Sequence, residues 1–297
     1  MSARDASGAL PRRSATLVVP VLFSVALFPI ALGQEPRPQE PAPTPTPAKP
    51  GVPARAWAAV RREANRYGRD SVALFKAPLN WQKRDWEKAG GAVLVLGGLM
   101  LADRSIDNAA QRQRSHFTDR VAGATTSLGG QYGVHASTAL LGLGLLFNHE
   151  NMRDTGREAL EAGLFAHLLN SYVLKRAFGR ERPYESDGRT VFVPGSSHDS
   201  FPSGHATEAF AVASVVAARS KGWPIPLLAY TAATIVALDR INSRVHFTSD
   251  VVAGAFVGTA IGRFLVKRHF DEKAGVLSKA NFEVVPIRSG LAARLRF

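Results

Sequence analysis

The feature that most constrains the fold is a series of apolar stretches of helical length that fills the chain from about residue 54 onward. Turns rich in glycine and proline separate the stretches, and the alternation of apolar and polar residues that is typical of strands is not seen before about residue 280. We therefore predict an all-α protein, a helical bundle of about six core helices. The predicted helices cover residues 54–75, 89–102, 137–147, 157–178, 206–219, 224–238 and 251–267.

The first 53 residues have the pattern of a leader and a linker. A charge-free run, residues 14–33, follows three arginines and ends with small residues at Ala31 and Gly33, the two positions that a signal peptidase reads. We predict that residues 1–33 are a cleaved signal peptide. An uncleaved anchor is the alternative, because about 20 apolar residues can span a bilayer. Residues 34–53 are rich in alternating proline, which favours an extended Pro-rich linker.

The C-terminal tail differs from the rest of the chain. Apolar residues alternate with other residues at Phe282 and Val284 and again from Leu291, on either side of a turn at Gly290. This pattern predicts a short C-terminal β-hairpin over residues 276–297, acting as a packing appendage. The predicted helical domain then spans residues 54–275.

The length of the apolar stretches bears on whether the bundle lies in water or in a membrane. Most of them are about 12–17 residues long, below the roughly 18–20 residues that a span requires. Charged residues such as Glu208 and Arg263 lie within them. We expect buried helices of a soluble bundle, exported to the periplasm or the cell exterior after signal cleavage. The alternative is an inner-membrane protein that is multi-pass or anchored by its N-terminus.

Charge and composition narrow the classes of partner. The chain has 37 Lys and Arg against 24 Asp and Glu, a net charge of +13, which favours phosphate esters, acidic lipid surfaces or nucleic acid. An export signal, and basic residues that do not interleave with aromatic ones, exclude nucleic acid as the expected partner. The sequence has no cysteine, which excludes disulfides, thiolate metal sites and a cysteine nucleophile.

The first of three short segments that matter chemically supplies two long cations. Lys175 and Arg182 are seven residues apart, which places them two turns apart on nearly one face of a helix. Pro183 follows and is expected to stop that helix. Alone, a basic helix end is typical of a solvated surface or of compensation of the helix dipole.

The second segment, Phe201-Pro202-Ser203-Gly204-His205, directly precedes a predicted helix. Open backbone N–H groups and the helix dipole at such a start favour an anion. Gly204 lets the anion approach closely, and His205 would stand beside it. A simple N-cap with a surface histidine is the ordinary alternative.

The third segment ends with Asp250, four residues after His246. A carboxylate at that spacing can accept the imidazole N–H, fix the tautomer and stabilise the charged ring, while the other ring nitrogen is free to attack. Alone, such a pair is most often structural. Together the three segments supply cations, an anion-ready helix start and two histidines, which is what phosphoryl transfer without a metal requires.

The three segments resemble the signatures of the type 2 phosphatidic acid phosphatase / vanadium haloperoxidase superfamily, namely Lys-x6-Arg-Pro, Pro-Ser-Gly-His and Ser-Arg-x5-His-x3-Asp. The matching residues are Lys175, Arg182 and Pro183, then Pro202 to His205, then Arg240, His246 and Asp250. The chain departs from the pattern at Asp239, where the family has serine. Ser243 and Arg244 look like the family's Ser-Arg pair but stand too close to His246, so Arg244 is the reserve candidate for the phosphate-binding role of Arg240.

The resemblance implies a role for each matched residue. His246 would attack phosphorus and form a phosphohistidine, Asp250 would orient His246, and His205 would protonate the leaving oxygen. The phosphate oxygens would be held by a larger set: Lys175, Arg182, Ser203, Gly204 and Arg240. No metal and no cofactor would be needed.

The function that follows is that of an exported, metal-independent phosphatase, a phosphoric monoester hydrolase. Its partner would be a phosphorylated small molecule or a lipid, with a lipid phosphate or pyrophosphate favoured, and a membrane surface is a further expected contact. One alternative is a vanadium-dependent haloperoxidase on the same scaffold. The other is a non-catalytic exported anion-binding protein, against which the intact pair His205 and His246 argues.

Overall fold

The computed structural model describes residues 54–127, 132–186, 191–279, 281–287 and 290–296. The predicted signal peptide, 1–33, and the Pro-rich linker, 34–53, lie outside the described residues. The domain boundaries predicted at these positions stay predictions.

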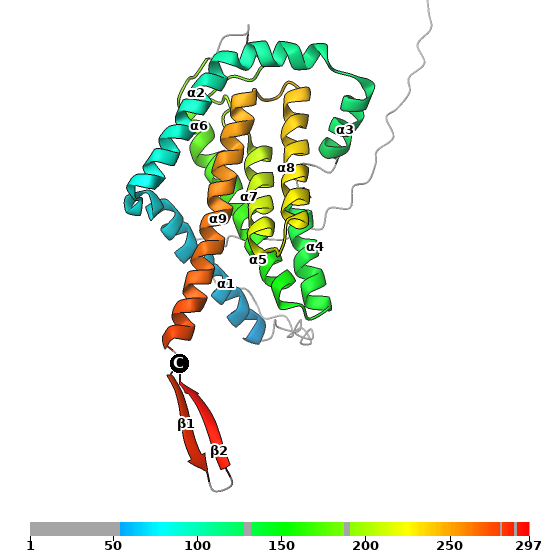
Figure 1. The fold of residues 1–297 in the computed structure, drawn as a ribbon. Coiled ribbons are helices and arrows are strands. Elements are labelled where there is room, and N and C mark those ends of the chain that lie inside the picture. The colour runs from blue at the N-terminus through cyan, green and yellow to red at the C-terminus, as the bar shows by residue number, and fades with distance from the viewer. Residues whose placement is uncertain (1–53, 128–131, 187–190, 280, 288–289, 297) are drawn as a thin grey trace, which may run out of the picture. The chain divides into compact units, whose positions relative to one another are not determined.

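The described part of the chain is built from helices, so the predicted all-α class is confirmed (Figure 1). A 3₁₀ turn, Ala77–Asn80, follows the first helix, and a π-helical segment, Leu169–Leu174, joins the fifth helix to the sixth. The helices are α1 (Ala54–Lys76), α2 (Lys83–Arg112), α3 (His116–Ser127), α4 (Tyr132–Leu146), α5 (Glu150–Leu168), α6 (Lys175–Phe178), α7 (Gly204–Arg219), α8 (Pro224–Asn242) and α9 (Thr248–Lys279).

Helix α7 lies at the centre of the core and packs against α5, α8 and α9. Small residues make this packing close. A Cβ on Gly258 of α9 would lie 2.1 Å from the carbonyl oxygen of Thr207 on α7, so only glycine fits there. Close packing of α7 against α9 holds the start of α7 beside the start of α9, where the predicted site residues lie.

The helices are longer than the apolar stretches that predicted them. Helix α2 has 30 residues and continues through Asp103 and Asp107, both of which are buried. Helix α9 has 32 residues. The sequence-based boundaries were wrong because they stopped at charged residues, whereas a helix continues through a charge that finds a partner.

The longer helices change the expectation about the membrane. Three described helices are long and apolar enough to cross a membrane: Lys83–Arg112, Pro224–Asn242 and Thr248–Lys273. Large apolar side chains such as Leu94, Leu101 and Leu228 are 79%, 90% and 68% exposed. Apolar side chains on the outside are typical of helices in contact with lipid. These observations favour the membrane-anchored alternative and correct the expectation of a soluble bundle.

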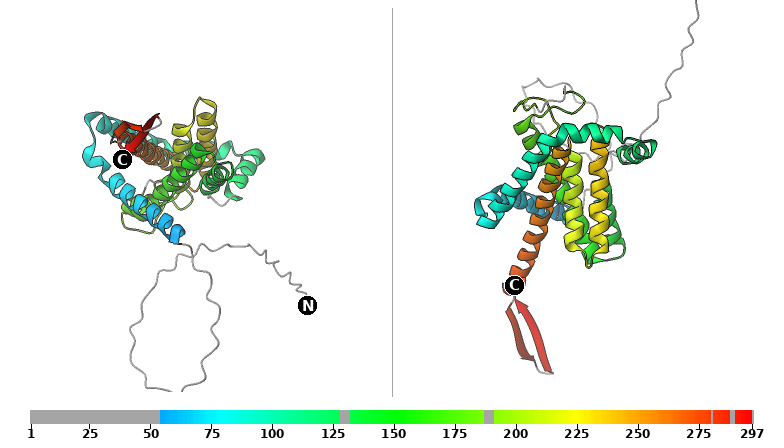
Figure 2. Two further views of the ribbon diagram at one scale, coloured as in Figure 1. Left: turned by 90° about the horizontal axis from the view of Figure 1, so that it is seen from below. Right: turned by 45° about the horizontal axis from the view of Figure 1, so that its top comes forward.

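Three further features complete the described fold. The sequence analysis did not predict α3, a short helix whose mean composition is polar. The second half of α2 lies across the ends of α8 and α9 in both Figure 1 and Figure 2. Beyond α9 the chain forms two antiparallel strands, β1 (Asn281–Ile287) and β2 (Gly290–Arg296). The role of this hairpin as a packing appendage stays a prediction.

Candidate active site

The predicted site residues converge at one end of the bundle. His205 lies in the first turn of α7, Arg240 in the last turn of α8, and Asp250 in the first turn of α9. His246 lies in the connection between α8 and α9. The charges of Arg240, His246 and Lys175 all act on the pKa of His205, so each of these side chains lies within electrostatic reach of His205.

The ring of His246 is buried, with 3% of the residue exposed, and its orientation is set by a backbone carbonyl. Nδ1 lies 2.7 Å from the carbonyl oxygen of Ser200. A carbonyl oxygen only accepts hydrogen bonds, so Nδ1 carries the proton and Nε2 keeps its lone pair. Burial lowers the pKa of His246, against the opposing effect of Asp250, and this favours the neutral ring that a nucleophile needs.

The expected contact between Asp250 and the His246 ring is not a direct hydrogen bond. Oδ2 of Asp250 lies 3.7 Å from Nδ1 of His246, beyond hydrogen-bond distance. That oxygen accepts from the Ser200 hydroxyl at 2.6 Å and from the backbone N–H of Phe247 at 2.8 Å. Asp250 therefore acts on His246 directly through its charge and holds the ring in place through Ser200, and this corrects the sequence-based geometry.

His205 is partly buried beside several positive groups. Burial, followed by the charges of Arg240, His246 and Lys175, lowers the pKa of His205 to about 4. The ring is therefore neutral at pH 7 when no anion is bound. A phosphate group would offset the positive charges and favour the protonated ring that an acid catalyst requires.

Lys175 and Arg182 do not share a helix face, contrary to the prediction. Helix α6 ends at Phe178 because Gly179 adopts a left-handed conformation with φ of 55°, where a Cβ would lie 1.9 Å from the carbonyl oxygen of Val193. The glycine, and not Pro183, ends the helix. Arg182 lies in the loop that follows.

The two cations nevertheless meet, because both pair with Asp199. Arg182 donates from Nε to Oδ1 at 2.7 Å and from Nη2 to Oδ2 at 2.9 Å, while Lys175 Nζ lies 3.2 Å from Oδ2. Burial opposes the ionised form of Asp199, but the Arg182 hydrogen bonds and the Lys175 charge prevail and lower its pKa to about 2. A carboxylate thus occupies the two cations that were predicted to bind phosphate.

A cavity of about 520 Å³ reaches this ion pair. Lys175, His198 and Asp199 contribute to its lining, and the two histidines 205 and 246 do not. The Lys175–Asp199 ion pair is therefore part of the wall of this cavity.

The start of α7 contributes one unpaired hydroxyl and one backbone contact. Ser203 is fully buried, and its hydroxyl has no hydrogen-bond partner among the described residues. Its backbone N–H donates to the carbonyl of Asp250 at 3.0 Å, so this N–H is not open to phosphate. The backbone N–H groups of Gly204 and His205 lie in the first turn of α7, so no carbonyl of a preceding helical turn accepts a hydrogen bond from them.

Of the two arginines considered for the third phosphate contact, Arg240 is the one near His205. It pairs with its neighbour Asp239, which also accepts from the Ser243 hydroxyl at 3.1 Å. Arg244 instead points to α2, where its Nη2 lies 2.9 Å from Asp107. The reserve candidate is therefore engaged in joining the α8–α9 connection to α2.

The sequence analysis missed a buried polar network behind His246. Arg180 is fully buried and contacts Asp250, Ser249 and Asp103. The sequence did contain an indication of this network: Asp103 lies within an apolar helix, where a buried carboxylate without a partner would destabilise the fold. A buried cation was therefore to be expected as its partner.

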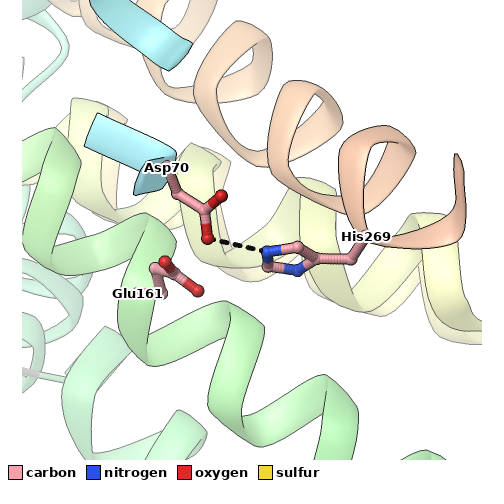
Figure 3. Close-up of side chains that lie close together, drawn as sticks. All are labelled: Asp70, Glu161 and His269. Atoms are coloured by element: carbon pink, nitrogen blue, oxygen red, sulfur yellow. Dashed lines mark hydrogen bonds and ion pairs between the residues drawn. The ribbon is translucent and has the colours of Figure 1, made fainter. Parts of the chain in front are cut away.

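A second cluster, Asp70, Glu161 and His269, is the one group of side chains in the described part that could hold a metal ion (Figure 3). The candidate ligand atoms lie within 4.8 Å of one another. Arginines already neutralise the two carboxylates, with Arg66 at 2.9 Å from Glu161 and Arg268 at 2.6 Å from Asp70. We interpret this distal cluster as an ion network that joins α1, α5 and α9.

Comparisons with known proteins give the family. The model of the PAP2 superfamily matches residues 159–274, a range that contains every predicted site residue and ends before the C-terminal hairpin, so it gives the hairpin no support. The chain is 34% identical over 170 residues to the decaprenylphosphoryl-5-phosphoribose phosphatase of Mycolicibacterium smegmatis, covering 57% of this chain and 83% of that protein.

Two further likenesses are to a lipid A phosphatase and to a solved structure. The lipid A 1-phosphatase of Rhizobium etli is 38% identical over 103 residues, which are 33% of this chain and 41% of that relative. The crystal structure of a transmembrane PAP2 type phosphatidylglycerolphosphate phosphatase from Bacillus subtilis superposes with a TM-score of 0.47 and 25% identity, over 62% of this chain and 95% of that one. On the family match and the extended likeness to the mycobacterial phosphatase, the chain belongs to the PAP2 superfamily and is a phosphoric monoester hydrolase.

Proposed function

We propose that this chain is a membrane-embedded phosphatase that removes phosphate from lipid phosphates or pyrophosphates through a phosphohistidine formed on His246. The observation that carries the proposal is the state of the His246 ring. Its Nδ1–H is engaged by the Ser200 carbonyl, which leaves Nε2 unprotonated within electrostatic reach of His205 and Lys175. A neutral, fixed imidazole beside cations is suited to attack on a phosphate ester.

The proposed reaction has two steps. In the first, Nε2 of His246 attacks phosphorus, the bond to the leaving oxygen breaks, and His205 gives that oxygen a proton. In the second, His205 accepts a proton from water, the water oxygen bonds to phosphorus, and the N–P bond breaks to release phosphate. Lys175, Arg182 and Arg240 would stabilise the charge on the equatorial oxygens, the part that a metal ion has in other phosphoryl-transfer sites.

The lipid nature of the substrate is supported by the position of the site. The predicted catalytic groups lie at the ends of α8 and α9, two of the helices that are long enough to cross a membrane. A phosphate at a membrane surface would meet these groups while its hydrocarbon part stays among lipids. The relatives' names, a decaprenylphosphoryl-phosphoribose phosphatase and a lipid A 1-phosphatase, point to the same substrate class.

We also propose that the N-terminal segment directs the chain across the inner membrane, so that the site faces the exterior. N-terminal sequencing of protein purified from membranes tests this. We expect a mature chain that begins at Gln34. A chain that begins at its first residues would instead make residues 1–33 an uncleaved anchor.

The function is tested by phosphate release from a panel of esters: long-chain lipid phosphates, a lipid pyrophosphate, short-chain lipid phosphates and a soluble sugar phosphate, each with and without a chelator. We expect hydrolysis of lipid substrates that the chelator does not change and that His246→Ala abolishes. Bromide oxidation by peroxide that requires added vanadate, without phosphate release, would favour the haloperoxidase. Binding of vanadate without either activity would favour the non-catalytic protein.

A further inference from the structure

Arg180 is a fully buried arginine at the centre of the polar network behind His246. Its Nη1 donates to Asp250 at 2.5 Å and to the Ser249 hydroxyl at 2.6 Å, and its Nη2 donates to Asp103 at 2.7 Å. The guanidinium carbon lies 4.3 Å from the ring centroid of Phe247, so an aromatic face covers the charge. These contacts together hold the guanidinium of Arg180 in a single orientation.

Arg180 holds Ser200 from two sides. The carbonyl of Arg180 accepts the backbone N–H of Ser200 at 2.9 Å. The guanidinium of Arg180 fixes Asp250, and the other carboxylate oxygen of Asp250 accepts the Ser200 hydroxyl at 2.6 Å. Ser200 is the residue whose carbonyl takes the Nδ1–H of His246. The orientation of the His246 ring therefore depends on Arg180 through two separate hydrogen-bond paths.

The other terminal nitrogen of the guanidinium, Nη2, pairs with a carboxylate on α2. Asp103 accepts from Arg180 Nη2 and also from the backbone N–H of Ser249 at 2.9 Å. A carboxylate on α2 thus fixes both Arg180 and the first turn of α9, which carries Asp250. A lysine could not replace this arrangement, because its single ammonium group cannot bridge two carboxylates in a fixed plane.

We propose that Arg180 is a positioning residue for the phosphatase reaction: anchored on Asp103, it fixes Asp250 and Ser200 and thereby aligns the ring of His246 for attack. This rests on the proposed function, in which His246 is the nucleophile. Arg180 touches neither the phosphate nor a reacting atom in this arrangement. Its loss should therefore slow the chemical step and leave phosphate binding by Lys175 and Arg182 in place.

The test compares Arg180→Lys and the double variant Arg180→Met/Asp103→Leu with the wild type. The double variant removes one positive and one negative buried charge, so the net charge of the network is unchanged and folding is favoured over that of a single Arg180 replacement. The control is Arg66→Met/Glu161→Leu, which removes a buried ion pair of the distal cluster. For each protein, kcat and KM are measured with the best ester of the panel, inhibition by inorganic phosphate and by orthovanadate is titrated, and thermal unfolding is followed in one detergent.

We expect kcat per folded enzyme to fall about 100-fold in the double variant, the cost of a misplaced reacting group, and about tenfold in Arg180→Lys. KM and inhibition by inorganic phosphate should stay within about threefold, because the cations that bind phosphate are untouched. Vanadate inhibition should weaken about tenfold, since vanadate would bond to the misaligned Nε2. The control should keep its kcat within about twofold of the wild type.

A purely structural role makes a different prediction: the unfolding temperature falls while kcat per folded enzyme does not change. A folded double variant with a wild-type kcat would overturn the proposal, and so would an equal loss of kcat in the control. Should the double variant not fold, Arg180→Lys decides in the same way. Activity that survives His246→Ala would instead overturn the proposed function, whatever the Arg180 variants show.

Discussion

Helix α9 carries two buried clusters of the same residue types, one at its start and one around His269, and the difference between them shows what makes one a candidate catalytic site. At the start of α9, Asp250 lies beside both His246 and Arg180. The distal cluster, about 30 Å along the helix at 1.5 Å per residue, places His269 beside Asp70, with Arg268 as the cation (Figure 3). The residue types of the two clusters therefore do not show which cluster is the candidate catalytic site.

The environment of the imidazole nitrogens separates them. Both nitrogens of His269 face carboxylates, with Nε2 3.0 Å from Asp70 and Nδ1 3.1 Å from Glu158. In His246, Nδ1 is held by a neutral carbonyl, and Nε2 is left for chemistry. Lys175 and Arg182, which both pair with the part-exposed Asp199, add positive charge beside a cavity at the His246 end. A free ring nitrogen next to accessible cations, rather than a His–Asp–Arg set, is what indicates phosphoryl chemistry.

The largest difference between the two clusters is expected when each histidine is replaced in turn. We expect His246→Ala to lower kcat by about 10⁴-fold or more, as for loss of a nucleophile in other covalent enzymes. Phosphate release per folded enzyme is the measurement, with circular dichroism in the same detergent as the check on folding. Near-normal turnover in a folded His246→Ala protein would remove the distinction between the two clusters.

His205→Gln tests the proposed acid, and we expect a loss of about 10²–10⁴-fold with an alkyl phosphate. The loss should be much smaller with p-nitrophenyl phosphate, because nitrophenolate leaves without needing a proton. Rates with the two esters are compared for the wild type and the variant. An equal loss with both leaving groups would contradict the role of His205 as acid.

The pH dependence of kcat/KM is a second test of His205 as the acid. With a pKa of about 4, His205 is neutral in the free enzyme above that pH, so its catalytic proton must arrive with the substrate. The phosphate monoanion carries such a proton and loses it with a pKa of about 6. We expect kcat/KM for an alkyl phosphate to fall as the pH rises above about 6. A kcat/KM that rises through this range would show that the substrate dianion is the reactive species without protonated His205.

Asp199→Asn tests whether the carboxylate competes with phosphate for Lys175 and Arg182. Removing its charge should tighten inhibition by inorganic phosphate about three- to tenfold at pH 7, an effect of about 1 kcal/mol, typical of a partly exposed ion pair. Because the pKa of Asp199 is lowered to about 2, the carboxylate is ionised throughout the working range and its pairing is lost only as the pH falls through about 2. Titration of Asp199 should therefore not reduce the gain between pH 5 and 8. Weaker inhibition would mean that Asp199 positions the cations.

The smallest expected effect on activity comes from the distal cluster. His269→Ala should leave kcat within about twofold of the wild type and lower the free energy of unfolding by about 1–3 kcal/mol, because two buried carboxylates lose a partner. Thermal unfolding in detergent together with the phosphate-release assay measures both. A large loss of kcat without loss of stability would show that the distal cluster takes part in the reaction.

The helical class and the motif residues were predictable from the sequence because both depend on local spacing. The hydrophobic stretches predicted the positions of α7 and α8 to within a few residues. The length of α2 was not predictable from its apolar run, since Asp103 is buried within the helix through its ion pair with Arg180. Helix α9 likewise continues past its apolar run through charged residues that find partners, such as Arg268 with Asp70 and Lys273 with Asp154. The end of α6 was missed because the left-handed conformation of Gly179, and not the more conspicuous Pro183, terminates it.

The site geometry depended still more on tertiary contacts. A spacing of four residues indicated a direct contact between Asp250 and His246, and the intervening Ser200 comes from a segment 46 residues away from His246. The pairing of Lys175 with Asp199 spans 24 residues, through a loop that has no periodic pattern. Spacing predicts which residues share a turn, but it carries no information on which carbonyl or carboxylate another segment brings alongside.

The central claim is that Nε2 of His246 becomes phosphorylated. The most direct measurement is to quench the enzyme during turnover of a lipid phosphate under alkaline conditions, which preserve a phosphohistidine, and to locate the phosphoryl group by mass spectrometry of the peptide that contains residue 246. We predict a phosphoryl group on His246 in the wild type that disappears when the substrate is exhausted and is absent in His246→Ala. A phosphoryl group found on another residue during normal turnover would contradict it.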